Sequence, residues 1–170
     1  MKHIFKNALE LELIRKIEEV LVATKCSVRD VRFIQSQPSI LRVTLDSKEA
    51  DKEVGITECQ EVHQLINPMF DVWDPIETAY LLEVSSPGER APLRTEAHFQ
   101  KALGSDIEFK TVEPIELPEP MKPRTNWKVS LKALYENGIE VEDYSGVHKI
   151  NYEKISQARW MRNWLAKDKK

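Results

Sequence analysis

Apolar residues in the first half of the chain change their spacing twice, and each change predicts a different element. Over residues 8–22 they recur every three or four positions between charged residues, which predicts an amphipathic helix. Residues 27–35 and 40–46 instead alternate apolar and polar side chains on either side of the turn Gln37-Pro38-Ser39. This alternation predicts a β-hairpin after the first helix.

A second helix and a third strand complete the pattern of this half. Thr57 is the expected N-cap of the helix, because Gln60 stands three residues later at the spacing of a capping box. Pro68 is expected to end or distort its last turn. Residues 79–84 then predict an apolar strand, and Ser85-Ser86-Pro87-Gly88 predicts a turn. Two helices on one face of a small three-stranded sheet would form a complete domain, so we expect its boundary near Pro87.

Short strand signals dominate the second half. A short helix capped by Thr95 and stopped by Gly104 comes first, and the sequence Asn137-Gly138 is a strong hairpin signal. The residues that predict strands, with one helical turn at 152–155 before the last of them, are 107–112, 128–135, 139–144, 147–151 and 156–161. Residues 113–126 hold four prolines and are expected to form a long solvated loop. The succession of strands predicts a small β-barrel.

Charge and composition narrow the function. The 170 residues carry a formal net charge of −3, and the charge is uneven: residues 1–88 have 10 Lys/Arg and 15 Asp/Glu, whereas residues 89–170 have 15 and 13. An acidic half suits a basic protein and a mildly basic half suits phosphate, so a partner containing both is favoured. The sequence has no apolar run long enough for a membrane span, and we expect a soluble, cytoplasmic protein.

Candidate catalytic groups are few. His98 stands alone and is expected to lie at the surface. Cys59 and His63 stand one helical turn apart, but two ligands do not make a zinc site, and Cys26 and Cys59 are expected to be buried thiols. Ser85 and Ser86 lack the glycine-flanked elbow of a nucleophile, and no phosphate-binding glycine motif occurs. We therefore expect no enzyme activity, cofactor, metal or small-molecule substrate. A hydrolase built on one of these serines, or on Cys59 with His63, is the enzymatic alternative.

Basic residues interleaved with tryptophan are the better candidates for a binding site. Arginine and lysine side chains bind phosphates, and indole rings stack on unpaired bases. The tryptophans near these residues are Trp127, Trp160 and Trp164, which would otherwise pack into or cap the barrel. The basic residues are Arg90, Arg94, Lys122, Arg124, Lys128, Lys132, Lys154, Arg159 and Arg162.

Several short segments, taken in order, resemble the RimP family of bacterial ribosome maturation factors. The most specific of them is the strand and turn Leu81-Leu82-Glu83-Val84-Ser85-Ser86-Pro87-Gly88. The others are Leu41-Arg42-Val43-Thr44-Leu45-Asp46, Gly55-Ile56-Thr57-Glu58-Cys59, Asp74-Pro75-Ile76, Pro92-Leu93 and Ile155-Ser156-Gln157-Ala158-Arg159. The resemblance implies an α+β chain: an N-terminal two-helix, three-strand α/β domain, residues 1–86, followed by a small SH3-like or Sm-like β-barrel, residues 87–170.

The resemblance also implies a function and partners. It implies a non-enzymatic factor for ribosome biogenesis that binds the 30S ribosomal subunit precursor, near ribosomal protein S12 and 16S rRNA, and promotes small subunit maturation. We expect it to act as a monomer. The alternative is a protein-only adaptor that binds a basic partner without touching RNA. The candidate ribosome-binding residues are Ser86, Gly88, Arg90, Arg94, Lys122, Arg124, Lys128, Arg159 and Arg162.

Overall fold

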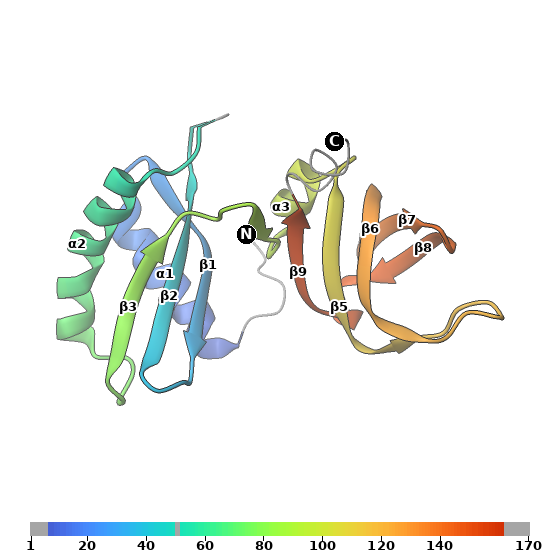
Figure 1. The fold of residues 1–170 in the computed structure, drawn as a ribbon. Coiled ribbons are helices and arrows are strands. Elements are labelled where there is room, and N and C mark those ends of the chain that lie inside the picture. The colour runs from blue at the N-terminus through green and yellow to red at the C-terminus, as the bar shows by residue number, and fades with distance from the viewer. Residues whose placement is uncertain (1–6, 50–51, 162–170) are drawn as a thin grey trace, which may run out of the picture. The chain divides into compact units, whose positions relative to one another are not determined.

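The computed structural model describes residues 7–49 and 52–161. Contacts between residues divide the chain into two compact units, with the division between Pro87 and Gly88. The unit before this point contains a three-stranded sheet, and the unit after it contains a six-stranded sheet (Figure 1).

The first unit has the predicted order of helix, strand, strand, helix, strand. Its elements are α1 (Ala8–Leu21), β1 (Cys26–Ile34), β2 (Ser39–Ser47), α2 (Ile56–Trp73) and β3 (Tyr80–Ser85). β1 and β2 pair as an antiparallel hairpin, whereas β2 and β3 are parallel. Parallel strands need a crossover connection, and α2 provides it.

Both helices of the first unit cover one face of its sheet and share a single core with it. Tyr80, Leu82 and Val84 of β3 pack against this core, whereas Leu81 between them is 55% exposed. This is the alternation of a strand with one face on the core. The fully buried side chains of the core include Leu13, Ile17, Leu21, Val31, Leu41, Val43, Leu45 and Ile66.

The ends of α2 differ from the prediction. The N-cap is Gly55, and its backbone N–H donates to Oε2 of Glu58 at 3.0 Å, so the expected pair Thr57 and Gln60 does not cap the helix. Pro68 does not end it either, because α2 continues to Trp73. Pro68 is exposed, so water can hydrate the carbonyl that loses its N–H donor in the preceding turn.

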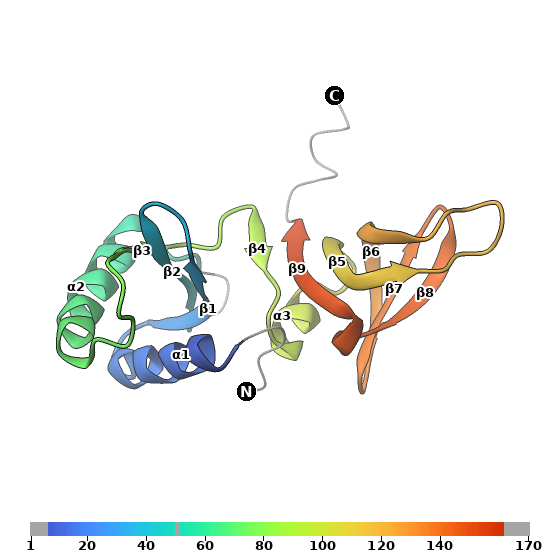
Figure 2. The same ribbon diagram turned by 90° about the horizontal axis from the view of Figure 1, so that it is seen from below.

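Strands form most of the second unit. Its elements are β4 (Arg90–Pro92), α3 (Glu96–Lys101), β5 (Asp106–Ile115), β6 (Arg124–Tyr135), β7 (Gly138–Asp143), β8 (Gly146–Asn151), the 3-10 turn η1 (Tyr152–Lys154) and β9 (Ile155–Met161). The strand order is β4-β9-β5-β6-β7-β8, and every neighbouring pair is antiparallel. The strands curve strongly around the core (Figure 2).

The chain is α+β as predicted, but a closed SH3-like or Sm-like barrel is not confirmed for the second unit. In the described residues no ladder joins β8 to β4, so these two strands are the edges of an open sheet. β4 has only three residues and includes Pro92, which lacks a backbone N–H. A short edge strand that contains proline offers little for another strand to pair with.

Three local features of the second unit also differ from the prediction. The predicted loop 113–126 is shorter, because β5 and β6 extend into it and pair as far as Ile115 and Arg124. β4 was not predicted. His98, for which a surface position was expected, is 6% exposed, and its Nδ1 accepts the backbone N–H of Arg94 at 3.1 Å.

The core of the second unit lies between the curved sheet and α3. Thr95 caps α3 as predicted, since its Oγ1 accepts the N–H of His98. The buried apolar side chains include Leu93, Phe99, Ile107, Phe109, Trp127, Leu131, Ile139, Val141 and Ile150. None of the helices in the described part of the chain is long and apolar enough to cross a bilayer.

Candidate nucleic-acid interface

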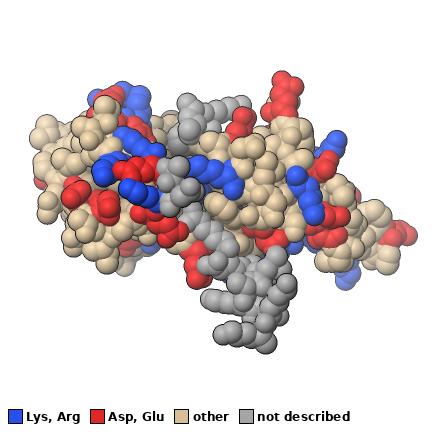
Figure 3. All heavy atoms as spheres, turned by 90° about the horizontal axis from the view of Figure 1, so that it is seen from above, with Lys and Arg blue, Asp and Glu red and all other residues tan. Residues whose placement is uncertain are grey.

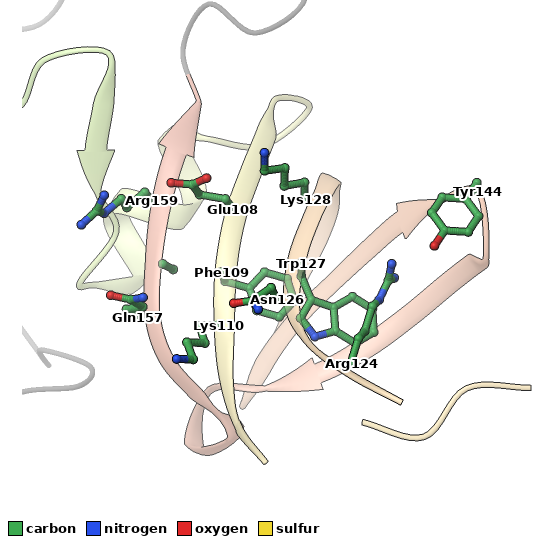
Figure 4. A pocket seen from close by; sticks show the side chains of 11 residues that line it. Glu108, Phe109, Lys110, Arg124, Asn126, Trp127, Lys128, Tyr144, Gln157 and Arg159 are labelled. Atoms are coloured by element: carbon green, nitrogen blue, oxygen red, sulfur yellow. The ribbon is translucent and has the colours of Figure 1, made fainter. Parts of the chain in front are cut away.

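A groove of about 530 Å³ lies over β5, β6 and β9 of the second unit, and the turn between β7 and β8 contributes to it (Figure 4). This volume is within the range of pockets that hold small ligands. Polar and charged side chains supply one part of its lining, namely Glu108, Lys110, Asn126, Lys128, Gln157 and Arg159. Aromatic side chains and an arginine supply another, namely Phe109, Arg124, Trp127 and Tyr144.

Strand register brings the polar lining together from three separate segments. Glu108 of β5 is directly opposite Lys128 of β6 and Arg159 of β9. Two residues further along β5, Lys110 is opposite Asn126 and Gln157. Directly opposed residues on neighbouring strands have side chains on the same face. The register therefore builds two polar rows, one with two cations around a carboxylate and one with a cation between two amides.

The groove has more positive than negative charge. Among the described residues Glu108 is its only acidic lining residue, and Arg90 of β4 reaches this carboxylate at 3.5 Å. Within residues 7–49 and 52–161, neither Lys110 nor Arg159 has an ion-pair partner. Elsewhere basic and acidic side chains lie side by side, as the face in Figure 3 shows. Positive charge in the groove therefore comes from particular side chains and not from a uniformly basic surface.

Arg124 stacks on two aromatic rings at one end of the groove. Its guanidinium carbon lies 3.8 Å from the ring centroid of Trp127 and 5.7 Å from that of Tyr144. Trp127 is 1% exposed and stacks on Phe109 with ring centroids 5.5 Å apart, whereas Tyr144 is 88% exposed. Cation–π contacts contribute from about 0.5 kcal/mol when exposed to about 2 kcal/mol when desolvated. Arg124 therefore connects the buried ring of Trp127 to the exposed ring of Tyr144.

Asp143 holds Arg124 in this position. The two side chains form an ion pair and are 8% and 19% exposed. Burial acts to raise the pKa of Asp143, but hydrogen bonds from Ser145 and Arg124 outweigh it, so the pKa of Asp143 is lower than its ordinary value. The carboxylate therefore stays charged and fixes the guanidinium plane.

Ser145 and His148 complete this cluster, but they do not form a catalytic triad with Asp143. The Ser145 hydroxyl donates to Oδ1 of Asp143 at 2.5 Å, so at 2.7 Å it accepts a hydrogen bond from Nε2 of His148. In a triad the serine donates to the histidine and the carboxylate holds the other ring nitrogen. Here Asp143 lies 3.7 Å from Nε2 itself. The cluster stabilises the turn between β7 and β8.

The sequence model of the RimP N-terminal domain matches residues 16–89 of the chain. The first unit is a RimP N-terminal domain. The match confirms the resemblance to the RimP family over the first unit.

Three of the residues predicted from the RimP resemblance and the basic pattern line the groove: Arg124, Lys128 and Arg159. Arg90 does not line the groove, but it forms an ion pair with the lining residue Glu108. Arg94 is 5% exposed and so presents little surface to a phosphate. The reason is its position next to the buried start of α3, which composition alone does not reveal.

The remaining predicted residues lie away from the groove lining or outside the described residues. Lys122 is exposed in the loop between β5 and β6, and Ser86 and Gly88 are exposed in the connection from β3 to β4. Gly88 has a φ of +65°, which suits glycine in a turn. Arg162, like Trp164, falls outside the described residues.

Among the lining residues that sequence reasoning missed are Lys110, Asn126, Tyr144 and Gln157. Alternation along the predicted strand 107–112 does place Lys110 on the polar face. The missing information was the register, which decides that Lys110 of β5 lies between Asn126 of β6 and Gln157 of β9.

The enzymatic alternatives gain no support from the residues that would carry them. Burial and the charge of Glu58 raise the pKa of Cys59, which disfavours the thiolate that a nucleophile or metal ligand needs. In the part of the chain that the structure describes, no group of three potential metal ligands occurs near Cys59 and His63 or elsewhere. Ser85 ends β3, and Ser86 begins the connection that follows.

Proposed function

We propose that the protein is a non-enzymatic ribosome maturation factor that binds the immature 30S subunit and promotes its maturation in the cytoplasm, as a monomer. The match of residues 16–89 to the RimP N-terminal domain carries this proposal. The groove over β5, β6 and β9 supports it, because its cations, amides and aromatic rings are the groups that proteins use to bind RNA.

The two halves of the chain suit two components of the partner. The groove is the proposed contact with 16S rRNA, through Lys110, Lys128 and Arg159. The acidic first half, with 10 Lys/Arg against 15 Asp/Glu, is the proposed contact with a basic protein, for which ribosomal protein S12 is the candidate.

A factor of this kind acts by differential binding. If it binds a productive conformation of the precursor better than a misfolded one, it shifts the population by the difference in affinity. No bond is made or broken, so no catalytic residue is required. The fixed Arg124–Asp143 pair suits this role, because a rigid surface distinguishes conformations better than a pliable one.

Removing the two unpaired cations of the groove tests the RNA contact. The double variant Lys110→Ala with Arg159→Ala is expected to bind 30S precursors about tenfold more weakly than the wild type in sedimentation. It should also reduce the slope of log affinity against log salt by about 1.5, because two phosphate contacts are lost. The measurement is co-sedimentation of the full chain with precursor particles over a range of salt.

The matched control removes two exposed lysines of the same unit that lie outside the groove: Lys101→Ala with Lys149→Ala. This control has the same net charge as the test variant, so it separates a local contact from overall charge. Equal binding and equal salt slopes for the two double variants would reject the groove as the RNA contact. Binding to isolated S12 without any crosslink to 16S rRNA would favour the protein-only adaptor instead.

A further inference from the structure

We propose that the aromatic end of the groove is a subsite for one unpaired base of single-stranded RNA, which stacks on Tyr144 while its neighbouring phosphates lie against Lys110 and Lys128. The proposal deepens the proposed function, on which the choice of RNA as the partner rests. Figure 4 shows the residues concerned.

The exposed ring of Tyr144 is the first observation that supports this subsite. It is 88% exposed at the tip of the turn between β7 and β8, although a tyrosine ring there gains nothing from burial in the fold. Its neighbours hold the turn rigid, because the backbone N–H of Ser145 donates to Oδ1 of Asp143 at 2.8 Å. An exposed aromatic ring on a rigid turn is a platform on which a base can stack with little loss of entropy.

Arg124 provides a second planar surface beside the platform. Its guanidinium lies 5.7 Å from the Tyr144 ring and is fixed from the other side by Trp127 and Asp143. Guanidinium planes stack on bases as aromatic rings do, and they add a positive charge that suits nucleic acid. Both planes lie at the same end of the groove, so a base stacked on Tyr144 would lie close to the Arg124 guanidinium.

Two buried hydrogen-bond donors of the groove lining have no partner in residues 7–49 and 52–161. They are Nε1 of Trp127 and Nε of Arg124. Buried donors are nearly always satisfied in folded proteins, so a ligand acceptor at this end of the groove would remove an unfavourable feature. The carbonyl oxygens and ring nitrogens of a base are acceptors of the required kind.

Beyond the aromatic end, the polar lining suits the rest of a nucleotide strand. Lys110 and Lys128 are exposed cations on neighbouring strands, and Asn126, opposite Lys110, offers a donor and an acceptor to a base edge. Bases within an RNA duplex are stacked inside the helix and cannot reach a protein ring. The arrangement therefore favours a single strand over a duplex and over an acidic peptide, which would use the cations but not the stack.

The experiment titrates the full chain into a short single-stranded RNA that carries one 2-aminopurine, whose fluorescence is quenched when it stacks. The wild type is expected to bind and quench this probe, and to bind the same RNA annealed to its complement much more weakly. Tyr144→Leu should weaken single-strand binding about tenfold and abolish the quenching, whereas Tyr144→Phe should retain both. Because Tyr144 is 88% exposed, neither variant should affect folding.

The outcomes separate this proposal from the proposed function. If Tyr144→Leu binds and quenches as the wild type does, the base subsite is rejected, even where the Lys110 and Arg159 variants still lose 30S binding. If Tyr144 governs single-strand binding while the chain does not sediment with 30S precursors, the subsite stands and the proposed function fails. Equal affinity for duplex and single strand, or tighter binding of an acidic peptide, would also overturn the subsite.

Discussion

Replacing Gly138 with alanine is expected to lower the free energy of unfolding of the second unit by about 3 kcal/mol. A Cβ atom at this position would lie 2.3 Å from the backbone oxygen of Ile150 and 2.4 Å from the hydroxyl of Tyr135. Both distances are well below van der Waals contact, so the surrounding structure must move. Moving a backbone oxygen within a strand disturbs the sheet and not only one side chain.

The surrounding pairing explains why this strain does not relax easily. Gly138 is paired with Tyr135 on one side and with Asn151 on the other. The hydroxyl of Tyr135 also donates to Oδ1 of Asn151 at 2.8 Å, so the tyrosine ring spans the glycine. An aromatic side chain over a strand glycine is a known way to stabilise the glycine, and it leaves no space for a methyl group.

Chemical denaturation followed by circular dichroism would measure the loss, with hydrogen exchange of the amides of β6, β7 and β8 assigning it to the second unit. Gly88→Ala is the matched control. It has a φ of +65° but no atom within 4 Å of its Cβ position, so its cost is limited to the left-handed backbone, about 1 kcal/mol. A loss in Gly138→Ala no greater than that in Gly88→Ala would contradict the steric argument.

Local patterns in the sequence predicted most elements of the fold, because each pattern has a local physical cause. Asn137-Gly138 predicted the turn between β6 and β7, and Thr95 predicted the start of α3. The predictions failed where an interaction with residues distant in the sequence, or exposure to solvent, determines the local structure. β4 is only three residues long and exists through its pairing with β9, and Pro68 stays within α2 because its face of the helix is exposed.

The same distinction explains how much of the candidate site was predicted. The types of residue and their interleaving with tryptophan pointed to Arg124, Lys128 and Arg159, all of which line the groove. Lys110 was missed because only the strand register places it near them. Arg94 was included because a sequence gives the charge of a side chain and not its burial.

Asp143→Asn is the substitution with the second largest expected effect, a loss of about 2 kcal/mol in the free energy of unfolding at neutral pH. The change removes the charge that pairs with Arg124 and leaves the guanidinium, with its side chain 19% exposed, without a counterion in a mostly desolvated place. It also weakens the acceptor of the Ser145 N–H and hydroxyl, which close the turn that carries Tyr144. The variant should therefore lose some base stacking as well.

The dependence of this loss on pH follows from the lowered pKa of Asp143. A carboxyl group whose pKa is lower in the folded state than in the unfolded chain stabilises the fold fully above the unfolded value, ordinarily 3.8. That stabilisation disappears as the pH falls through the folded pKa, because both states are then protonated. The difference in stability between wild type and Asp143→Asn should thus be constant near neutral pH and shrink below about pH 4.

Denaturation of both proteins at a series of pH values measures this difference. Glu116→Gln, an exposed change in the loop between β5 and β6, is the control and should leave stability nearly unchanged at neutral pH. A difference between wild type and Asp143→Asn that stays the same down to about pH 2 would mean that the Asp143 charge does not stabilise the fold. A difference that shrinks would tie the rigidity of the aromatic end of the groove to one carboxylate, because the same Asp143 fixes both Arg124 and the turn beneath Tyr144.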